Sequence, residues 1–301
     1  MPEFLKITLD DKKWIDQLVR AADLRYADYC FTNMYVWQDY YSLCAARIED
    51  RLAIRLCNNT ADGSSVYSFP IGFGELFPVI EQLRTDAASR GNRFVLRGIP
   101  KSKLDELKNF YPDLEFIFKR NESDYVYSAE RLASLIGKKM HAKRNHINRF
   151  IVENDWSFEP ITADNLHEVM EMNSEWMEQN FEEKNESYDN EKNALSRTFS
   201  NFEALELEGG VLRSGKRVIA YTIGEKLSGD TYVLHFEKAF SHIQGSYAMI
   251  NREYAKHILS IHPEIVYINR EEDLGLENLR KAKESYYPDF LSEKYTAVWS
   301  R

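Results

Sequence analysis

The chain has 301 residues, of which 44% are hydrophobic and 29% are charged, so it can form a globular core and is not a disordered chain. This length is comfortable for two domains. No apolar run reaches the roughly 20 residues that cross a bilayer. The first residues also lack the basic and apolar segments of a secretory signal, so we expect a cytoplasmic protein.

The net charge is -9, and it is unevenly distributed. Residues 1–150 contain 23 Lys and Arg against 20 Asp and Glu, whereas residues 151–301 contain 16 against 28. An acidic chain is a poor general nucleic-acid binder, because phosphate contacts need a cationic surface. A local basic surface remains compatible with this composition.

Cysteine and histidine patterns indicate neither a disulfide framework nor a metal centre. Cys30, Cys44 and Cys57 are odd in number and form no CxxC pair, which predicts buried thiols in a reducing compartment. No HExxH motif is present, and His141 and His146 lie five residues apart, off a common helical face. No Ser-His-Asp order is recognisable either. We therefore predict no metal ligands.

The first half begins with a helix-start signal. Thr8 and Asp11 have the spacing of a capping box, and apolar residues at helical spacing follow from Trp14 to Ala22. Alternating and apolar runs, separated by polar turns, predict the remaining elements of this half. These are a helix around residues 24–37, strands at 43–48, 52–57 and 65–69, a helix at 76–88 and a strand at 94–96.

The second half repeats this order. Its predicted elements are helices at 165–181 and 190–205, strands at 210–214, 218–227 and 231–237, a helix at 245–259, a strand at 265–269, a helix at 276–286 and a strand at 295–299. A further helix at 138–154 connects the halves. The shared order predicts a mixed α+β fold with two tandem domains of the GNAT (N-acyltransferase) type, built on mostly antiparallel sheets flanked by helices. The predicted division is 1–130, a basic connecting helix at 131–155, and 156–301.

In a GNAT-type domain, an acyl thioester binds where two strands separate, and its pyrophosphate lies on a helix N-terminus. Two segments match the glycine loop of that fold in part. Residues 69–74 contain Gly72 and Gly74, and residues 242–247 contain Gly245 and Ser246. We take Gly245 and Ser246 as candidate donor-binding residues; the alternative is that both loops are ordinary turns.

A polar stretch follows the predicted strand at 265–269, at the sheet edge where open α/β sheets bind ligands. Asn269 is a candidate catalytic residue, and Arg270, Asp273, Arg280 and Lys283 are candidates for binding the donor. Arg280 and Lys283 have the spacing of one helical face, so they could hold a carboxylate or phosphate. The alternatives are a solvated helix with surface ion pairs, and a helix-capping role for Asp273.

The end of the strand at 231–237 carries two further catalytic candidates. His235 or Glu237 could take a proton from an attacking amine. Simple alternation along a strand places both on one face, opposite Phe236. The alternative is a buried polar pair satisfied by its neighbours.

The segment from Arg131 to Val152 has no acidic residue. Within it, Lys143, Arg144 and Asn145 are candidates for binding the phosphates of coenzyme A or of a tRNA acceptor end. The alternative is a basic helix that pairs with the acidic second half of the chain.

Residues 135–150 and 269–288, together with the shorter stretches 209–212, 235–239 and 294–295, resemble the family typed by the C-terminal domain of phosphatidylglycerol lysyltransferase. The resemblance implies two fused GNAT-like domains, similar to Fem peptidyltransferases and to aminoacyl-tRNA protein transferases. Members with known activity move an aminoacyl group from tRNA to a lipid headgroup.

The resemblance therefore implies an acyl- or aminoacyltransferase that acts on an amine or hydroxyl. Acyl-coenzyme A or aminoacyl-tRNA would be its co-substrate, with no tightly bound cofactor. The donor would bind in the C-terminal domain or in an interdomain cleft. Two alternatives remain open: a ligand-sensing or partner-binding protein without catalysis, and a tRNA-binding accessory protein.

Overall fold

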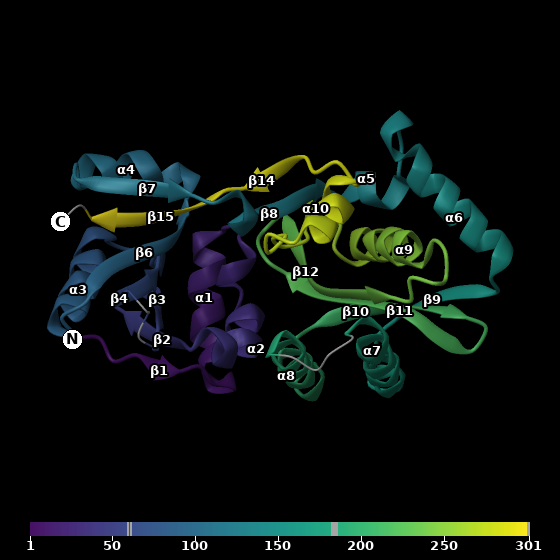
Figure 1. Cartoon of the computed structure of the whole chain (residues 1–301), viewed down its shortest axis with the longest axis horizontal. Coiled ribbons are helices and arrows are strands. Elements are labelled where there is room, and N and C mark those ends of the chain that lie inside the picture. The colour runs from purple at the N-terminus through teal and green to yellow at the C-terminus, as the bar shows by residue number, and fades with distance from the viewer. Residues whose placement is uncertain (59, 61, 182–185, 300–301) are drawn as a thin grey trace. The chain divides into compact units, whose positions relative to one another are not determined.

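The computed structural model describes residues 1–58, 60, 62–181 and 186–299, which form two compact units (Figure 1). Unit 1 comprises Met1–Asp124, Glu272–Gly275 and Leu291–Arg301, and unit 2 comprises Tyr125–Glu271 and Leu276–Phe290. Neither unit is continuous in sequence, because each sheet takes a strand from the other half of the chain. The sequence-based division was continuous and kept the C-terminal strand with the second half.

Unit 1 is built on a sheet with the order β1-β2-β3-β4-β6-β15-β7, with β5 paired to β3. Helix α1 contacts β3 and β5, α2 contacts β2, α3 contacts β4 and β6, and α4 contacts β7. The elements of this unit are β1 (Leu5–Lys6), α1 (Lys12–Ala22), α2 (Phe31–Tyr41), β2 (Leu43–Ile48), β3 (Arg51–Leu56), β4 (Ser64–Ser68), β5 (Ile71–Gly72), α3 (Phe77–Ser89), β6 (Arg93–Pro100), α4 (Leu104–Phe110), β7 (Leu114–Phe118) and β15 (Lys294–Trp299).

A 3-10 turn at Leu9–Asp11 leads directly into α1 and confirms the capping box. The Asp11 carboxylate accepts hydrogen bonds from the Thr8 backbone N–H and from the Thr8 hydroxyl, both at 2.8 Å. These contacts satisfy groups that a helix start leaves without a partner. Ile15, Leu18 and Val19 then form the buried face of the helix.

The prediction of three thiols is wrong for two of the cysteines. Cys44 and Cys57 form a disulfide with a Cα–Cα distance of 6.0 Å. The antiparallel register of β2 and β3 pairs Cys44 with Arg55 and Leu43 with Leu56, which brings Cys57 next to the start of β2. Thirteen residues of sequence separation give no sign of this proximity. Cys30 is buried, and its thiol donates to the Ala27 carbonyl at 3.1 Å.

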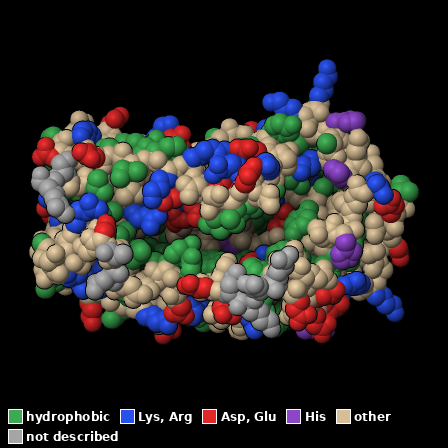
Figure 2. Space-filling view, viewed as in Figure 1, with side chains coloured by type: hydrophobic (Ala, Val, Ile, Leu, Met, Phe, Trp, Pro, Cys, Tyr) green, Lys and Arg blue, Asp and Glu red, His purple; other side chains and the backbone are tan. Residues whose placement is uncertain are grey.

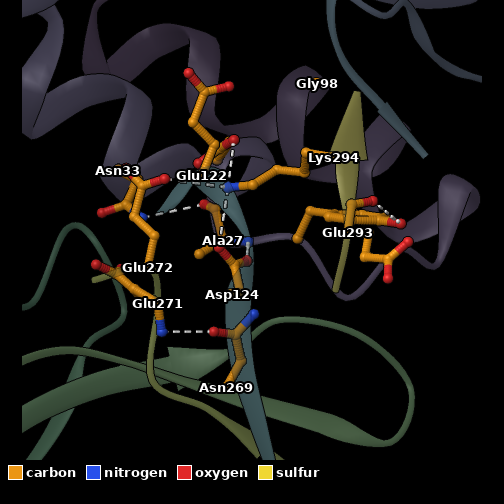
Figure 3. Close-up of polar contacts among 12 residues, drawn as sticks. Ala27, Asn33, Gly98, Glu122, Asp124, Asn269, Glu271, Glu272, Glu293 and Lys294 are labelled. Atoms are coloured by element: carbon orange, nitrogen blue, oxygen red, sulfur yellow. Dashed lines mark hydrogen bonds and ion pairs between the residues drawn. The ribbon is translucent and has the colours of Figure 1, made fainter. Parts of the chain in front are cut away.

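A buried lysine holds β15 in unit 1 (Figure 3). Lys294 is 3% exposed, and its Nζ lies 2.9 Å from Asp124 Oδ1 and 2.8 Å from Asp28 Oδ2. Glu272 lies farther off, at 3.8 Å. The second oxygen of Asp124 accepts a hydrogen bond from the Ala27 N–H at 2.8 Å. Because a buried charge needs partners, this cluster joins segments at both ends of the chain.

Unit 2 is built on a sheet with the order β14-β8-β13-β12-β11-β10-β9. Helices α6, α9 and α10 lie on one side of this sheet, and α7 and α8 lie on the other (Figure 1). The elements of this unit are β8 (Asp124–Ser128), α5 (Ala129–Ser134), α6 (His141–Glu153), β9 (Trp156–Pro160), α7 (Leu166–Asn180), α8 (Glu186–Ser200), β10 (Glu208–Ser214), β11 (Arg217–Lys226), β12 (Thr231–Ala239), α9 (Ser246–Ile261), β13 (Tyr267–Asn269), α10 (Glu277–Glu284) and β14 (Phe290–Ser292).

The predicted elements of both halves are present, with ends shifted by a few residues. The sequence did not predict β1, β5, α4, β7, β8, α5, β9 or β14. Within the ranges that the structure describes, no helix is long and apolar enough to span a membrane.

Candidate functional site

The two parallel strands at the centre of unit 2 separate after a short pairing. Only Thr231–Val233 of β12 pairs with Tyr267–Asn269 of β13. Strand β12 continues to Ala239, still paired with β11 on its other side. The backbone beyond Asn269 therefore leaves β12, and the end of β12 faces an opening in the sheet. Open sheets of this kind bind ligands at such a point.

The corresponding strands of unit 1 do not open in this way. Strand β4 pairs with β6 along its whole length, from Ser64–Arg93 to Ser68–Arg97. Just beyond, the Tyr29 hydroxyl lies 3.2 Å from the Phe69 carbonyl and 2.9 Å from the Gly98 carbonyl. Gly98 has a φ of +71°, and a Cβ there would lie 2.9 Å from the Tyr29 hydroxyl. The Tyr29 side chain thus lies where β4 and β6 would have to separate to form an opening like that between β12 and β13.

Glu237 is the centre of a polar cluster at the opening of unit 2. Its Oε1 accepts a hydrogen bond from Arg270 Nη2 at 2.8 Å, and its Oε2 accepts one from Asn251 Nδ2 at 3.2 Å. Three elements supply these groups, since Glu237 lies on β12, Asn251 on α9 and Arg270 directly after β13. The structure therefore brings together two predicted site residues, Glu237 and Arg270, that are 33 residues apart.

The Arg270 guanidinium is packed between aromatic rings. Its Cζ lies 4.9 Å from the ring centroid of Tyr286 and 5.7 Å from that of Tyr127. Burial is the largest influence on the pKa of Arg270 and acts to lower it. Glu237 and the two tyrosines act in the opposite direction and keep that pKa above its ordinary value. Arg270 is therefore a permanent cation at this position.

Three buried polar atoms around Glu237 have no hydrogen-bond partner among the described residues. They are Nη1 of Arg270, Oδ1 of Asn251 and Oγ1 of Thr222. Thr222 lies directly opposite Glu237 in the β11–β12 register, so both side chains project from the same face. Buried polar atoms normally have partners. A guanidinium donor, an amide oxygen that accepts and a hydroxyl that can donate or accept, all without partners, therefore indicate a binding site for a polar group.

Lys143 of α6 lies beside this cluster. Its Nζ is 3.8 Å from the centroid of the Tyr286 ring, the same ring that Arg270 covers. Burial, with a smaller contribution from the nearby Arg270 charge, lowers the pKa of Lys143 to about 8, although Glu237 acts against this shift. About a tenth of Lys143 is therefore neutral at pH 7, far more than for an ordinary lysine.

Lys283 does not form an exposed cationic face with Arg280, contrary to the sequence-based expectation. Its side chain is 7% exposed, and Nζ donates to the carbonyls of Arg270 at 2.6 Å and Glu271 at 3.1 Å. The Tyr127 hydroxyl donates to the Lys283 carbonyl at 2.8 Å. Lys283 thus positions the backbone that carries Arg270. Lys281 instead pairs with Glu277 on the surface, as the alternative interpretation of this helix proposed.

His235 occupies a different environment from Glu237. Its Nδ1 lies 2.9 Å from Glu271 Oε1 and its Nε2 lies 3.0 Å from Glu225 Oε1, and the ring is 1% exposed. A β-bulge explains the difference, because Leu234 pairs with Gly224 while Phe236 already pairs with Ile223. The extra residue breaks the alternation of side chains along β12. His235 and Glu237 therefore lie on different faces, and the prediction that they share one face is wrong.

The buried side chain of Asn269 is used in the turn after β13, where its Oδ1 accepts a hydrogen bond from the Glu271 N–H at 2.7 Å. Asp273 belongs to unit 1. There it is fully buried, lies 3.2 Å from Arg120 and accepts from the Gly275 N–H at 2.9 Å. Both side chains stabilise turns in the structure.

The glycine loop before α9 is packed against α6. Gly245 has a φ of +90°, and a Cβ there would lie 2.5 Å from the His146 carbonyl oxygen and 3.0 Å from Phe150 Cβ. Glycine is therefore required both by the backbone conformation and by the close approach of α6. The Ser246 hydroxyl is buried and donates to the Phe240 carbonyl at 2.9 Å. Helix α6 thus lies where a pyrophosphate on this helix N-terminus would need space.

The other predicted residues of the basic segment have separate roles. Arg144 donates to the carbonyls of Leu135 and Gly137, which fixes the loop before α6. Asn145 is exposed and lies 3.4 Å from His141. Lys and Arg side chains and histidines are visible over the α6 region in Figure 2, and acidic side chains gather over α7. Lys143 is the member of this segment that reaches the polar cluster.

Comparisons with known proteins give a consistent result. The family "Phosphatidylglycerol lysyltransferase, C-terminal" matches residues 20–298. A conserved protein of unknown function from Bacteroides thetaiotaomicron is 38% identical, with a TM-score of 0.92 and coverage of 100% of both chains. A comparison with curated proteins found no match.

More distant solved structures share the fold. The C-terminal domain of a putative lysylphosphatidylglycerol synthetase from Agrobacterium fabrum is 14% identical, with a TM-score of 0.68 and coverage of 97% of this chain and 92% of that one. FemX is 10% identical, with a TM-score of 0.64 and coverage of 98% and 97%. These likenesses confirm the mixed α+β fold with tandem GNAT-like domains. The chain belongs to the family typed by the C-terminal domain of phosphatidylglycerol lysyltransferase.

Proposed function

We propose that the protein is an acyl- or aminoacyltransferase that binds an activated carboxyl group in unit 2 and transfers it to an amine or hydroxyl. The observation that carries this proposal is the polar cluster at the separation of β12 and β13. There Arg270 Nη1, Asn251 Oδ1 and Thr222 Oγ1 surround Glu237 without hydrogen-bond partners among the described residues. Family membership supports the same class of reaction.

In this proposal, Arg270 and Glu237 perform different parts of the reaction. Nη1 of Arg270 donates to the carbonyl oxygen of the donor and stabilises the negative charge that develops on it. Glu237 accepts the proton of the attacking amine or hydroxyl. The new bond forms between that nitrogen or oxygen and the carbonyl carbon, the ester or thioester bond breaks, and the leaving group takes the proton.

An aminoacyl ester on tRNA is the favoured donor. The close packing of α6 against Gly245 leaves little room for a coenzyme A pyrophosphate at the start of α9. A tRNA acceptor end does not require that position. The free polar atoms around Glu237 also include two acceptors, which suit the ammonium group of an aminoacyl donor better than a plain acetyl group.

The test is a single-turnover transfer assay with bulk tRNA charged with radiolabelled amino acids and, in parallel, with labelled acetyl-coenzyme A. A panel of amine and hydroxyl acceptors is screened, including phosphatidylglycerol in vesicles. Arg270→Lys and Glu237→Gln should each slow transfer by about 100-fold, which is typical for the loss of one oxyanion donor or one general base. Lys281→Ala is the matched control, since the Lys281 side chain is 68% exposed and forms a surface ion pair with Glu277. Equal rates in all four proteins would reject these assignments.

A second candidate function is ligand binding without transfer. The same unpartnered atoms would hold a polar ligand whether or not chemistry follows, and the Tyr29 hydroxyl closes the equivalent position in unit 1. A rise in the unfolding midpoint with aminoacyl ligands, without turnover on any acceptor, would favour this candidate.

A further inference from the structure

Lys143 is a chemically distinct amine within unit 2. Its Nζ lies over the Tyr286 ring and forms no hydrogen bond or ion pair with any described residue. Two nearby lysines differ from Lys143, one in its exposure and the other in its hydrogen bonds. Lys139, four residues earlier, lies 5.2 Å from the centroid of the Tyr287 ring and is exposed, while Lys283 is bound to two backbone carbonyls.

The surroundings of Lys143 favour its neutral form. The charged groups that face it are Arg270, directly after β13, and Glu237 on β12, and Tyr286 lies beneath it. Burial and the Arg270 cation lower the pKa of Lys143 to about 8. An ordinary lysine has a pKa of about 10.4, so far more of Lys143 is neutral near pH 7.5. Only a neutral amine attacks a carbonyl carbon.

Lys143 also lies next to the atoms proposed to hold the donor. Arg270 and Lys143 cover the same aromatic ring, and Nη1 of Arg270 is one of the unpartnered atoms beside Glu237. A carbonyl oxygen bound at Nη1 would bring the carbonyl carbon into the neighbourhood of the Lys143 amine. The side chain of Lys143 is half-buried, so it is also accessible from solvent.

We propose that Lys143 is a self-acylation site, at which Nζ takes an acyl group from an activated ester bound beside Arg270 and Glu237. This inference rests on the proposed function for the place where the donor binds. The lone pair of Nζ forms a bond with the carbonyl carbon, and the ester C–O bond breaks. The nitrogen loses one proton, which the departing oxygen takes to leave as an alcohol, or which passes to solvent when the leaving group is a phenolate. The product is a secondary amide on Lys143.

The experiment uses p-nitrophenyl acetate as the probe on the full chain, followed by peptide mass spectrometry of each lysine. At pH 7.5, acetylation of Lys143 should exceed that of the exposed Lys139 by at least about tenfold, because burial increases the neutral fraction of Lys143. The rate at Lys143 should reach half its maximum near pH 8. Lys143→Arg keeps the cation over Tyr286 but should abolish the labelled peptide, and Lys139→Arg should leave Lys143 labelling unchanged. Equal labelling of Lys143 and Lys139 would overturn the inference.

A second arm uses aminoacylated tRNA and separates this inference from the proposed function. Selective acetylation by the ester without any transfer from tRNA would support the reactive lysine and contradict the proposed donor. Transfer from tRNA to an added acceptor without selective modification of Lys143 in either arm would contradict the inference and leave the proposed function standing. A circular dichroism spectrum of Lys143→Arg, compared with that of wild type, checks that the variant is folded.

Discussion

Replacing Lys294 with methionine should destabilise the protein strongly. The substitution keeps the length and apolar stem of the side chain but removes the cation that lies 2.9 Å from Asp124. Asp124 is then left as a charged group that is 1% exposed, with the Ala27 N–H as one remaining donor. Removing one partner of a buried ion pair costs about 3–5 kcal/mol of unfolding free energy. The exposed pair Lys281–Glu277 offers a contrast, since exposed pairs contribute at most about 1 kcal/mol.

The assay is urea unfolding followed by fluorescence, which measures the free energy of the transition that involves unit 1. Lys294→Met should lose about 3–5 kcal/mol, Lys281→Met should lose less than about 1 kcal/mol, and the double variant Lys294→Met, Asp124→Asn should recover part of the loss. The recovery is expected because an asparagine can still accept from Ala27 but carries no charge. A loss below about 1 kcal/mol for Lys294→Met would show that the buried Lys294–Asp124 pair contributes no more than an exposed one.

The pH dependence of this cluster follows from the same contacts. Burial acts to lower the pKa of Lys294, but Asp124, Asp28 and Glu272 together raise that pKa well above its ordinary value. A raised pKa in the folded state stabilises the protein below the ordinary value, and this stabilisation disappears as the pH rises through the folded value. The difference between wild type and Lys294→Met should therefore persist from neutral to mildly alkaline pH.

Three further outcomes are expected. Asp86 accepts hydrogen bonds from Arg55, Tyr67 and Arg90; burial acts to raise its pKa, but these hydrogen bonds outweigh burial and lower that pKa below its ordinary value. Asp86→Asn should therefore lower the free energy of unfolding by about 2–4 kcal/mol at pH 7. In urea unfolding, this difference from wild type should shrink as the pH falls below about 4. Gly245→Ala should cost about 1–3 kcal/mol, because the added Cβ meets the His146 carbonyl, whereas Gly215→Ala, where no atom lies within 4 Å, should cost less; equal thermal shifts would contradict this. Alkylation of the denatured, unreduced protein should modify Cys30 alone, and modification of all three cysteines would show that the Cys44–Cys57 bond is absent.

Local sequence patterns predicted most helices and hairpins, because their signals lie within a few residues. The Thr8–Asp11 box and the alternation in β2 and β3 are of this kind. The patterns did not predict the exchange of strands between the halves, since β8 and β15 find their sheet partners far away in the sequence. Local patterns also could not predict the Cys44–Cys57 disulfide, because it depends on the register of β2 against β3.

For the candidate site, the sequence suggested Glu237, Arg270 and Lys143 as candidates but not their arrangement. Thr222 and Asn251 carried no motif, and only the strand register and the position of α9 bring them to Glu237. The bulge at His235 is likewise invisible in the sequence, and it overturned the expected shared face. Residue types therefore indicated the chemistry, whereas packing determined which side chains meet.

Binding of the proposed donor at the polar cluster of unit 2 can be measured without turnover. Isothermal titration with puromycin, an aminoacyl nucleoside that cannot complete ester transfer, tests it most directly. We expect binding to wild type, at least about tenfold weaker binding to Arg270→Lys, where the guanidinium geometry is lost, and unchanged binding to Tyr29→Phe in unit 1. Binding that is unaffected by Arg270→Lys but lost in Tyr29→Phe would contradict donor binding at this cluster.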